Sequence, residues 1–362
     1  MTFKLLSKAA LALAAMGLCL SAASAAYKSE YKLSVVPGAS SGWGQTATFF
    51  ADCVRQKSNG RINIKPYFGA QLMAGKQTSE LLLVRRGAID FALASTINWS
   101  PQIKELNLTA LPFFVANNPD RYKAIDAIEA GKSGKSGKML EKAIEKTGVK
   151  FLGWSENGFR ELTTSKGPIE KPEDMKGMKL RVCGTPIFID IFSSLGANPQ
   201  AINWSEAVTG FQQGIVDGQE NPTNGINVPT KVWQWHKYST DWHYMIDPLF
   251  FTANMKVWKE FSPEDQKLIL SCATEAEKYG KALSRLSNDN GQAYEYLKSI
   301  NKLPAITNPK EELKKNGMTV TEYTPEMIKR FYEATAGVRA DWTQKIGPNV
   351  VKAAEEDMQA AK

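Results

Sequence analysis

The spacing of apolar residues in the first hundred positions predicts alternating strands and helices. Apolar and polar residues alternate over residues 31–36, which indicates a strand, and the period lengthens to that of an amphipathic helix over residues 43–60, a segment that ends at a glycine. The same order follows as a strand at 61–68, a helix at 79–87 and a strand at 88–95. Strands that alternate with helices are typical of a mostly parallel sheet with helices on both faces.

The same rhythm restarts in the middle of the chain. Strands are predicted at residues 149–154, 160–165 and 178–183, and helices at 186–196 and 205–214. The pattern therefore predicts a second α/β domain.

Two later segments are expected to connect these domains. Residues 238–253 are rich in aromatic and β-branched residues and predict a pair of strands that returns to the first domain. Residues 262–300 keep a helical period for about ten turns, after Ser262 as N-cap and Pro263 at the first helical position. A helix of that length could lie across both domains.

The N-terminus has the pattern of a secretory signal peptide. Lys4 and Lys8 precede an apolar run over residues 9–20, and small residues follow at a plausible cleavage point, so we expect residues 1–26 to be removed. A membrane span would need about twenty apolar residues. A lipid anchor at Cys19 is disfavoured because Leu18 stands where a small residue is usual.

The charge balance excludes some partners. The full chain carries a formal charge of +8, and removal of the two lysines in the signal peptide leaves +6 (8 − 2 = 6). These cations are scattered among acids and form no basic stripe with interleaved aromatic residues, so no nucleic-acid partner is expected. The modest excess can instead raise the local concentration of anionic ligands.

The cysteines predict neither a disulfide scaffold nor a zinc site. Cys53, Cys183 and Cys272 remain after cleavage, and no two of them are close in sequence. We expect buried thiols, with one bridge among the three as the alternative in an oxidising compartment. No metal and no cofactor is expected.

One motif has to be tested as an enzyme signature. The segment "GASSG", residues 38–42, matches the nucleophile elbow of hydrolases and places Ser40 between a strand and a helix. However, no earlier strand is available to supply an oxyanion loop, and only His236 and His243 could act as base. A secreted serine hydrolase is therefore a less favoured hypothesis. A periplasmic scaffold or signalling partner is a second alternative.

A short basic repeat, "GKSGKSGK" at residues 131–138, invites comparison with a phosphate-binding loop. The spacing of its glycines does not fit that motif, and no strand leads into it. We interpret the repeat as an exposed loop between two helices.

Two arginines are the strongest candidates for a binding site. Arg181 alternates with aliphatic residues near the C-terminal end of a predicted strand, where ligands of open α/β sheets bind. Its planar guanidinium matches a carboxylate or a sulfonate, although an exposed ion pair is an equal alternative. Arg160 gives a weaker signal, and its alternative is a salt bridge to Glu156 or Glu220.

The segment "QQGIVDGQENP", residues 212–222, predicts a short strand followed by a turn. Pro222 biases Asn221 toward extended geometry, so Asn221 becomes a candidate N-cap with Pro222 at the first helical position. The amide of Asn221 and the free backbone donors could bind an anion there. A purely structural cap is the alternative.

Three segments of the sequence resemble a known protein family. The segments "GFRELTTSKGPIEKPEDMKGMKLRV", "LGANPQAINWSEAVTGFQQGIVDGQENP" and "LPFFV" are similar to the DctP-type solute-binding proteins of tripartite ATP-independent periplasmic (TRAP) transporters. The likeness extends over nearly all of the chain after the signal peptide.

The resemblance implies a two-lobed α/β fold with mixed, mostly parallel sheets and a long helix spanning both lobes. Lobe I is expected to comprise residues 27–157 plus about 247–285, and lobe II residues 158–246 plus about 286–362. Such proteins act in the periplasm, catalyse nothing, and deliver organic acids to membrane permease subunits of the transporter. We expect a monomer that closes on its ligand.

The resemblance also assigns roles to individual residues. It implies that Arg181 binds the carboxylate of the ligand, that Arg160 and Asn221 assist it, and that Trp204 walls the cleft. Sialic-acid members of the family carry an acid at the position of Ser95 and an asparagine at that of Pro37, so sialic acid is not the expected ligand.

The same departures point to a different cleft in the first lobe. Ser95 and Trp43 are expected to contribute to it, and Trp43 and Trp99 are expected either to contact the ligand or to pack in the core. Dicarboxylates, keto acids, sugar acids and small sulfonates all present the same anionic end to one arginine, so the sequence predicts an organic anion without naming it.

Overall fold

The computed structural model describes residues 27–116, 118–130 and 134–361. The predicted signal peptide, residues 1–26, therefore lies outside the described residues, as does the part of the basic repeat at residues 131–133. The repeat was predicted as a loop, but its final residues form the first turn of a helix that begins at Lys135. No helix in the described part of the chain is long and apolar enough to cross a membrane.

Ten strands form the sheets. They are β1 (Tyr31–Ser34), β2 (Ile64–Tyr67), β3 (Phe91–Ser95), β4 (Val149–Thr164), β5 (Lys179–Val182), β6 (Asn198–Ala201), β7 (Gly218–Pro222), β8 (Tyr238–Asp241), β9 (Ile246–Asn254) and β10 (Thr319–Glu322).

The helices alternate with these strands and then continue alone to the C-terminus. They are α2 (Gly42–Lys57), α3 (Glu80–Arg86), α4 (Thr96–Trp99), α5 (Arg121–Glu129), α6 (Lys135–Glu145), α7 (Pro186–Ser194), α8 (Trp204–Gln212), α9 (Met255–Glu260), α10 (Pro263–Arg285), α11 (Gln292–Ser299), α12 (Pro309–Lys315), α13 (Pro325–Ala334), α14 (Ala336–Ile346) and α15 (Pro348–Ala360).

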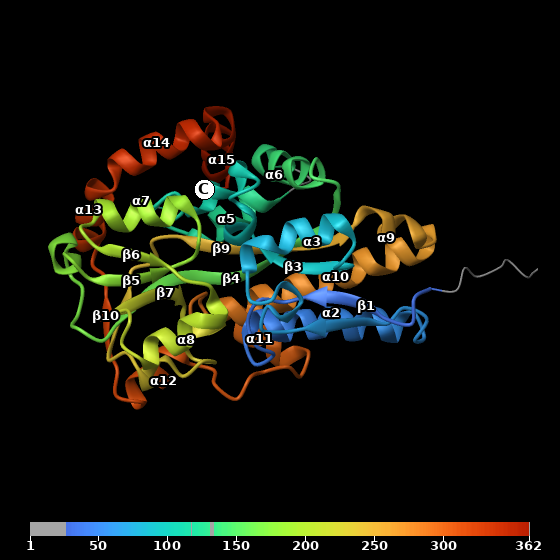
Figure 1. Cartoon of the computed structure of the whole chain (residues 1–362), viewed down its shortest axis with the longest axis horizontal. Coiled ribbons are helices and arrows are strands. Elements are labelled where there is room, and N and C mark those ends of the chain that lie inside the picture. Colours follow the sequence, from blue (N-terminus) through green and yellow to red (C-terminus); the bar gives the residue numbers. More distant parts are fainter. Residues whose placement is uncertain (1–26, 117, 131–133, 362) are drawn as a thin grey trace, which may run out of the picture.

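The strand order confirms the two-lobed α/β fold. One sheet has the order β2-β1-β3-β9-β4, and the second continues from β4 through β7, β5 and β6. Strand β8 also pairs with β4, and β10 pairs with β8. The outer pairs of each sheet are parallel, whereas the central pairs that involve β4 and β9 are antiparallel. Figure 1 shows the two sheets side by side, with β1 and β3 in one lobe and β5, β6 and β7 in the other.

Strand β4 belongs to both sheets. Residues 149–154 and 160–165 were predicted as two strands, but they form one strand of 16 residues. Its first part, to Phe159, pairs with β9, and from Arg160 onward it pairs with β7. A register shift between Glu156 and Gly158 leaves Asn157 as a bulge at the boundary. The separate predictions failed because the bulge interrupts the alternation of apolar and polar residues.

The sheet of the first lobe is covered on both faces. Phe50 of α2 packs on Phe251 with ring centres 4.6 Å apart, which places α2 on the same face as α10. Phe250 points to the opposite face, where its ring packs edge-on against that of Trp99 with ring centres 5.0 Å apart. Helices α3 and α4 contact β9 on this face. Alternate residues of β9 therefore serve two apolar layers, which explains why this strand is buried along its whole length.

Helix α10 spans the junction of the lobes but is shorter than predicted. It extends for 23 residues, about 34 Å, and ends at Arg285. Leu286 has non-helical backbone geometry and Ser287 adopts a left-handed one, so the chain leaves the helical path directly after Arg285. At Gly280 a side chain would meet Ser155 Oγ at 2.2 Å and Thr46 at 2.9 Å, so glycine allows α10 to lie directly against β4 and α2.

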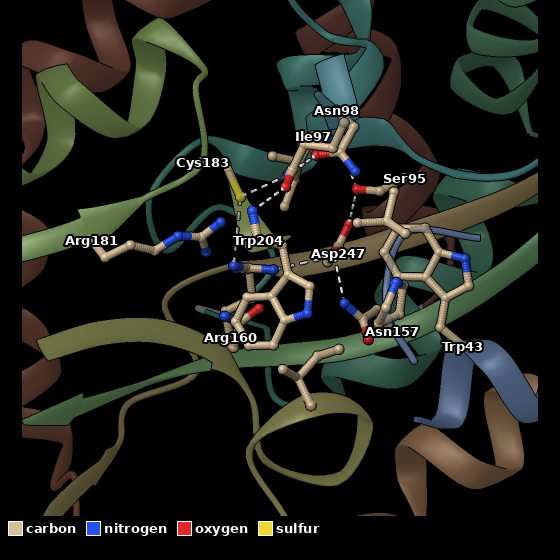
Figure 2. A pocket seen from close by; sticks show the side chains of 15 residues that line it. Trp43, Ser95, Ile97, Asn98, Asn157, Arg160, Arg181, Cys183, Trp204 and Asp247 are labelled. Carbon is tan, nitrogen blue, oxygen red and sulfur yellow. Dashed lines mark hydrogen bonds and ion pairs between the residues drawn. The ribbon is translucent and has the colours of Figure 1, made fainter. Parts of the chain in front are cut away.

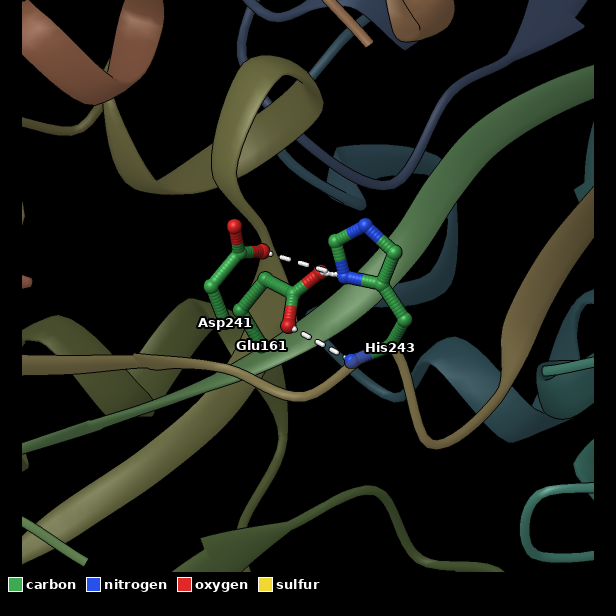
Figure 3. Close-up of side chains that lie close together, drawn as sticks. All are labelled: Glu161, Asp241 and His243. Atoms are coloured by element: carbon green, nitrogen blue, oxygen red, sulfur yellow. Dashed lines mark hydrogen bonds and ion pairs between the residues drawn. The ribbon is translucent and has the colours of Figure 1, made fainter. Parts of the chain in front are cut away.

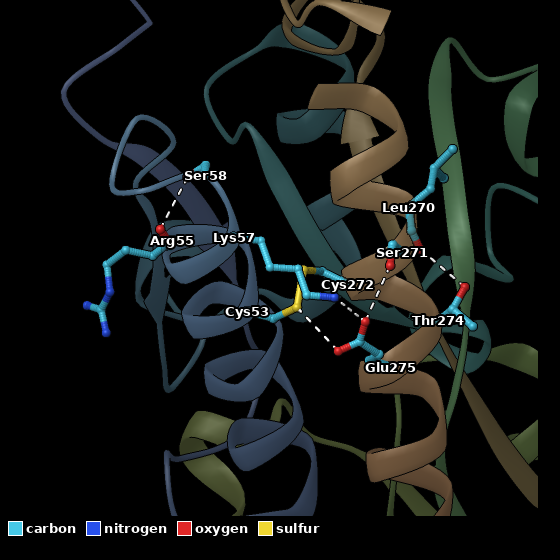
Figure 4. Close-up of a disulfide and its surroundings, with 9 residues drawn as sticks. All are labelled: Cys53, Arg55, Lys57, Ser58, Leu270, Ser271, Cys272, Thr274 and Glu275. Carbon is cyan, nitrogen blue, oxygen red and sulfur yellow. Dashed lines mark hydrogen bonds and ion pairs between the residues drawn. A yellow bond between two sulfur atoms is a disulfide. The ribbon is translucent and has the colours of Figure 1, made fainter. Parts of the chain in front are cut away.

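A disulfide joins α2 to α10. Cys53 and Cys272 are bonded, with Cα atoms 5.7 Å apart, whereas Cys183 is a buried free thiol (Figure 4). The expectation of three buried thiols was therefore wrong for this pair. The two cysteines are 219 residues apart in sequence and come together because α2 and α10 lie side by side on one face of the sheet.

The C-terminal helices pack on elements of both lobes. Asp357 of α15 accepts a hydrogen bond from Ser136 Oγ at 2.6 Å, next to α5 and α6. Trp342 of α14 donates to Asp190 of α7 at 2.8 Å. The final segment therefore forms a brace along the outside of the molecule (Figure 1).

Candidate functional site

A small cavity lies where the two sheets meet, and all six residues predicted from the sequence line it (Figure 2). Its volume is about 30 Å³. The lining residues are Val36, Pro37, Trp43, Gln77, Ser95, Ile97, Asn98, Asn157, Arg160, Arg181, Cys183, Trp204, Asn221, Ile226 and Asp247. They come from both lobes, so the cavity is closed only when the lobes face each other.

Arg181 of β5 is buried in the wall of this cavity without an acidic partner. Its side chain is 1% exposed, its Nε donates to the carbonyl of Ile202 at 3.0 Å, and its guanidinium lies 5.4 Å from the centre of the Trp204 ring. Within the described part of the chain, its Nη2 has no hydrogen-bond partner. Burial lowers the pKa of Arg181, because the charged form loses its hydration. The exposed ion pair considered from the sequence is therefore not what the structure contains.

Arg160 of β4 is already neutralised. Its guanidinium forms a two-pronged ion pair with the Glu220 carboxylate, including Nη2 to Oε1 at 2.8 Å, and its Nη1 lies 3.3 Å from Asp247 Oδ2. Burial disfavours the charge, but the facing Glu220 carboxylate outweighs it and raises the pKa of Arg160. The salt bridge to Glu220 that the sequence left open is therefore present, and Arg160 remains at the cavity wall.

Asp247 is the acidic residue that lines the cavity, and it was not predicted from the sequence. It lies on β9, where Ser95 Oγ donates to its Oδ1 at 2.7 Å and Asn157 Nδ2 donates to its Oδ2 at 2.8 Å. Burial raises the pKa of the Asp247 carboxyl. A charged residue inside the apolar segment around Pro248 is the one signal that could have marked it.

Of the three tryptophans considered from the sequence, two line the cavity and one packs in the hydrophobic core. Trp43, at the start of α2, lines the cavity and donates its indole N–H to the carbonyl of Leu93 at 2.7 Å. Trp204 begins α8, and its ring faces Arg181. Trp99 instead packs in the core, where its indole N–H donates to Glu80 at 3.0 Å.

Asn221 lines the cavity but does not cap a helix. It belongs to β7, where its side-chain amide donates to Gln219, and Pro222 is the residue that precedes the short helical turn Thr223–Asn227. The predicted N-cap was wrong because the strand continues through Pro222, which pairs with Arg160 across the ladder.

Three further polar residues line one side of the cavity and were not predicted as site residues: Gln77, Asn98 and Cys183. Gln77 donates to Asn98 Oδ1 at 2.7 Å and contacts Cys183 Sγ at 3.8 Å, and its Oε1 accepts from the backbone N–H of Trp204 at 2.8 Å. These side chains therefore satisfy one another. Gln77 and Asn98 come from the first lobe, whereas Cys183 and Trp204 come from segments of the second.

The histidines considered for a hydrolase are engaged elsewhere. His236 is buried against Thr163 Oγ1 at 2.9 Å, and burial lowers its pKa to about 4. His243 forms ion pairs with two carboxylates, whereas Ser40 is exposed. No serine, histidine and acid are therefore arranged as a nucleophilic triad among these residues.

His243, Glu161 and Asp241 form a compact ionic cluster outside the cavity lining (Figure 3). The His243 Nδ1 lies 2.5 Å from Glu161 and 3.0 Å from Asp241, and Lys310 pairs with Asp241. Burial alone would lower the pKa of His243, but Glu161 and Asp241 raise it to about 9. Burial raises the pKa of Glu161, whereas the nearby cations lower that of Asp241. The imidazolium and Lys310 supply the positive charge that these carboxylates need.

This cluster predicts a pH-dependent stability. The pKa of His243 is about 9 in the folded chain and about 6.5 in the unfolded chain. Its contribution to the free energy of unfolding is therefore fully present below about pH 6.5 and is lost as the pH rises through 9. The loss amounts to about 3 kcal/mol in the free energy of unfolding. His243→Asn, which tolerates the left-handed backbone there, should remove this dependence.

Urea unfolding of both chains at pH 6, 7.5 and 9 provides the measurement. The difference in unfolding free energy between parent and variant should shrink with rising pH. A difference that stays constant across this range would contradict the assignment of a protonated His243.

The family model for bacterial extracellular solute-binding protein, family 7 (DctP), matches residues 33–345. The chain belongs to this family. A solved structure to which this chain is similar is that of a TRAP periplasmic solute-binding protein from Ralstonia eutropha with bound (S)-2-acetolactate, 42% identical to this chain. That comparison covers 92% of this chain and 100% of the other, with a TM-score of 0.82.

Two further proteins are similar to this chain at lower sequence identity. The sugar acid binding protein of Advenella mimigardefordensis in complex with galactonate is 25% identical, with a TM-score of 0.78 over 92% of this chain and 98% of the other. A C4-dicarboxylate-binding periplasmic protein of Vibrio cholerae is 25% identical over 312 residues, 86% of this chain and 85% of its own length. This DctP-type chain is thus a TRAP solute-binding protein, as its sequence segments suggested.

Proposed function

We propose that this chain captures a small organic anion, a carboxylate or a sulfonate, in the cavity between its lobes, with Arg181 as the residue that binds the anionic group. The observation that supports the proposal is the buried guanidinium of Arg181, whose Nη2 has no hydrogen-bond partner within the described residues. Burying an unpaired charge costs free energy, so an unpaired buried cation is expected where an anionic ligand binds and neutralises it. Trp204, beside the guanidinium, forms the wall that shields the pair from water.

Binding requires the lobes to move. A cavity of about 30 Å³ has room for little more than a water molecule, so an organic acid can enter only when the walls separate. We infer that residues 27–157 plus about 247–285 form one lobe and residues 158–246 plus about 286–362 the other, and that β4 carries the hinge. Two charge-assisted hydrogen bonds from Arg181 offer about 3 to 6 kcal/mol, whereas a micromolar Kd needs about 8 kcal/mol. Closure supplies the remainder by burying the apolar part of the ligand.

The family sets the wider role. Family 7 proteins are the substrate-binding components of TRAP transporters, and we propose that this chain works as a periplasmic monomer that delivers its ligand to the membrane permease subunits without changing it chemically. Ser95, Trp43, Asn221 and Arg160 shape the cavity around that ligand. No cofactor or metal is needed for this cycle.

A thermal-shift panel tests the proposal. The chain from residue 27 onward is mixed with millimolar carboxylates, sulfonates, neutral sugars and amino acids, and (S)-2-acetolactate is the first choice because a relative 42% identical holds it. A ligand at a thousand times its Kd adds about 4 kcal/mol of stability, enough for a rise of several degrees in Tm. The rise should be confined to anions. A panel in which neutral sugars alone raise the Tm, or nothing does, would reject the proposed function.

A further inference from the structure

Two fully buried polar atoms of the lining side chains lack a hydrogen-bond partner among the residues described. One is Nη2 of Arg181, a cationic donor, and the other is Oδ1 of Asn157, a neutral acceptor. Both side chains are almost completely buried, at 1% and 2% exposure. A buried polar atom costs free energy unless it is paired, so both atoms call for complementary groups on a ligand.

The orientation of Asn157 is determined by its place in the strand. Asn157 is the bulge residue of β4, and a bulge re-aims a side chain relative to the regular ladder. Its Nδ2 donates to Asp247 at 2.8 Å, so the donor half of the amide is used and the acceptor half remains. A ligand hydroxyl can donate to Oδ1, whereas a carboxylate cannot.

The charges of the cavity leave room for one anionic group only. Of the three charged residues that line it, Arg160 is paired with Glu220 and Asp247, and Arg181 alone has no acid. A second carboxylate on the ligand would face Asp247 and find no unpaired cation. A proton on Asp247 would remove the repulsion and so part of this cost, but the second carboxylate would still be buried without a counter-charge.

The rest of the lining offers few additional partners. The amide nitrogen of Gln77 donates to Asn98 Oδ1 and to Cys183 Sγ. Val36, Ile97 and Ile226 supply apolar surface. A ligand with many hydroxyls would have to leave several of them unpaired in this cavity. Aliphatic carbons, by contrast, would gain from burial there.

We propose that the site is specific for short monocarboxylates that carry a hydroxyl, with the carboxylate on Arg181 and the hydroxyl on Asn157, and that it rejects dicarboxylates and polyhydroxylated sugar acids. This rests on the proposed function and narrows its substrate class. Asp247 and Asn157 are then the residues that set specificity, whereas Arg181 sets affinity for the anion.

A matched ligand series tests the specificity on the unaltered chain. Calorimetry compares sodium 2-hydroxybutanoate and 3-hydroxybutanoate with butanoate, which lacks the hydroxyl, with malate, which adds a carboxylate, and with gluconate. At least one hydroxybutanoate should bind about tenfold or more tightly than butanoate and about 100-fold more tightly than malate and gluconate. Malate or gluconate within tenfold of the best hydroxybutanoate would overturn the inference while leaving the proposed function intact. Failure of all five salts, together with a flat thermal-shift panel, would remove the proposed function itself.

A variant pair assigns the discrimination to Asp247. Asp247→Asn keeps the shape and the acceptor oxygen but removes the charge, so the affinity for malate relative to hydroxybutanoate should rise by about tenfold. Asp52→Asn, on the outer face of α2, is the matched control and should leave that ratio unchanged. An unchanged ratio in Asp247→Asn, or the same rise in both variants, would refute the role of Asp247. If Asp247→Asn does not fold, the ligand series on the unaltered chain decides alone.

Discussion

An Arg181→Met chain is expected to lose affinity for its anion by a factor of about 100 to 10,000 while folding at least as stably as the parent. Methionine fills most of the space of the arginine stem but offers no donor, so about 3 to 6 kcal/mol of charge-assisted hydrogen bonding disappears. The guanidinium is buried without an acidic partner in the described chain, and its removal relieves a desolvation penalty rather than breaking an ion pair. The Tm in the absence of ligand should therefore stay the same or rise.

Calorimetry and thermal unfolding of three chains make the measurement. Arg181→Lys retains the charge but loses the planar fork and should recover part of the affinity. Arg330→Met removes an exposed arginine that pairs with Glu173 and serves as the control for a general loss of positive charge. Affinity within tenfold of the parent in Arg181→Met would place the anion elsewhere in the cavity.

Removal of the Cys53–Cys272 disulfide should lower the free energy of unfolding by about 3 to 5 kcal/mol, and the Tm by at least about 5 °C. The bond closes a loop of 219 residues, so the unfolded chain loses much conformational freedom while it is intact. The Cys53→Ser/Cys272→Ser chain should also become insensitive to reducing agent, whereas the parent should fall to the same Tm when reduced.

Cys183→Ser is the matched control, because Cys183 is buried as a free thiol. It should retain the response of the parent to reducing agent. A double variant with the Tm of the parent, or a parent whose Tm is unaffected by full reduction, would show that the bond does not stabilise the folded chain.

The elements that the sequence predicted well are those with a regular period and strong end signals. Helix α2 and the strands β1 and β3 have uninterrupted apolar patterns, and all three begin within a few residues of their predicted positions. Prediction failed where tertiary contacts override the local pattern. Because of the bulge at Asn157, one long strand was predicted as two. Helix α10 ends at Arg285, because Leu286 is non-helical and Ser287 is left-handed, although the apolar period continues beyond it.

The site shows the same division. Arg181 could be predicted because it alternates with aliphatic residues in the pattern of a strand. Its planar guanidinium also matches the geometry of a carboxylate or a sulfonate. Gln77 and Asn98 carry no such signal, since Gln77 lies in the turn before α3 and Asn98 in α4, and both reach the cavity only through tertiary packing. The Cys53–Cys272 bond was equally invisible, because it depends on two helices meeting across most of the chain.

The bulge in the strand that both sheets share adds a side chain to the site without disturbing the ladder. Glu156 pairs with Pro248 and Gly158 with Asp247, so the residues on either side of Asn157 keep consecutive partners on β9 and face opposite sides of the sheet. A deletion of Asn157 would therefore let the ladder close with Arg160 on its present face, and the group lost from the site would be the one that donates to Asp247. Changes in length, and not only substitutions, are therefore a route by which a protein of this architecture can acquire a new ligand.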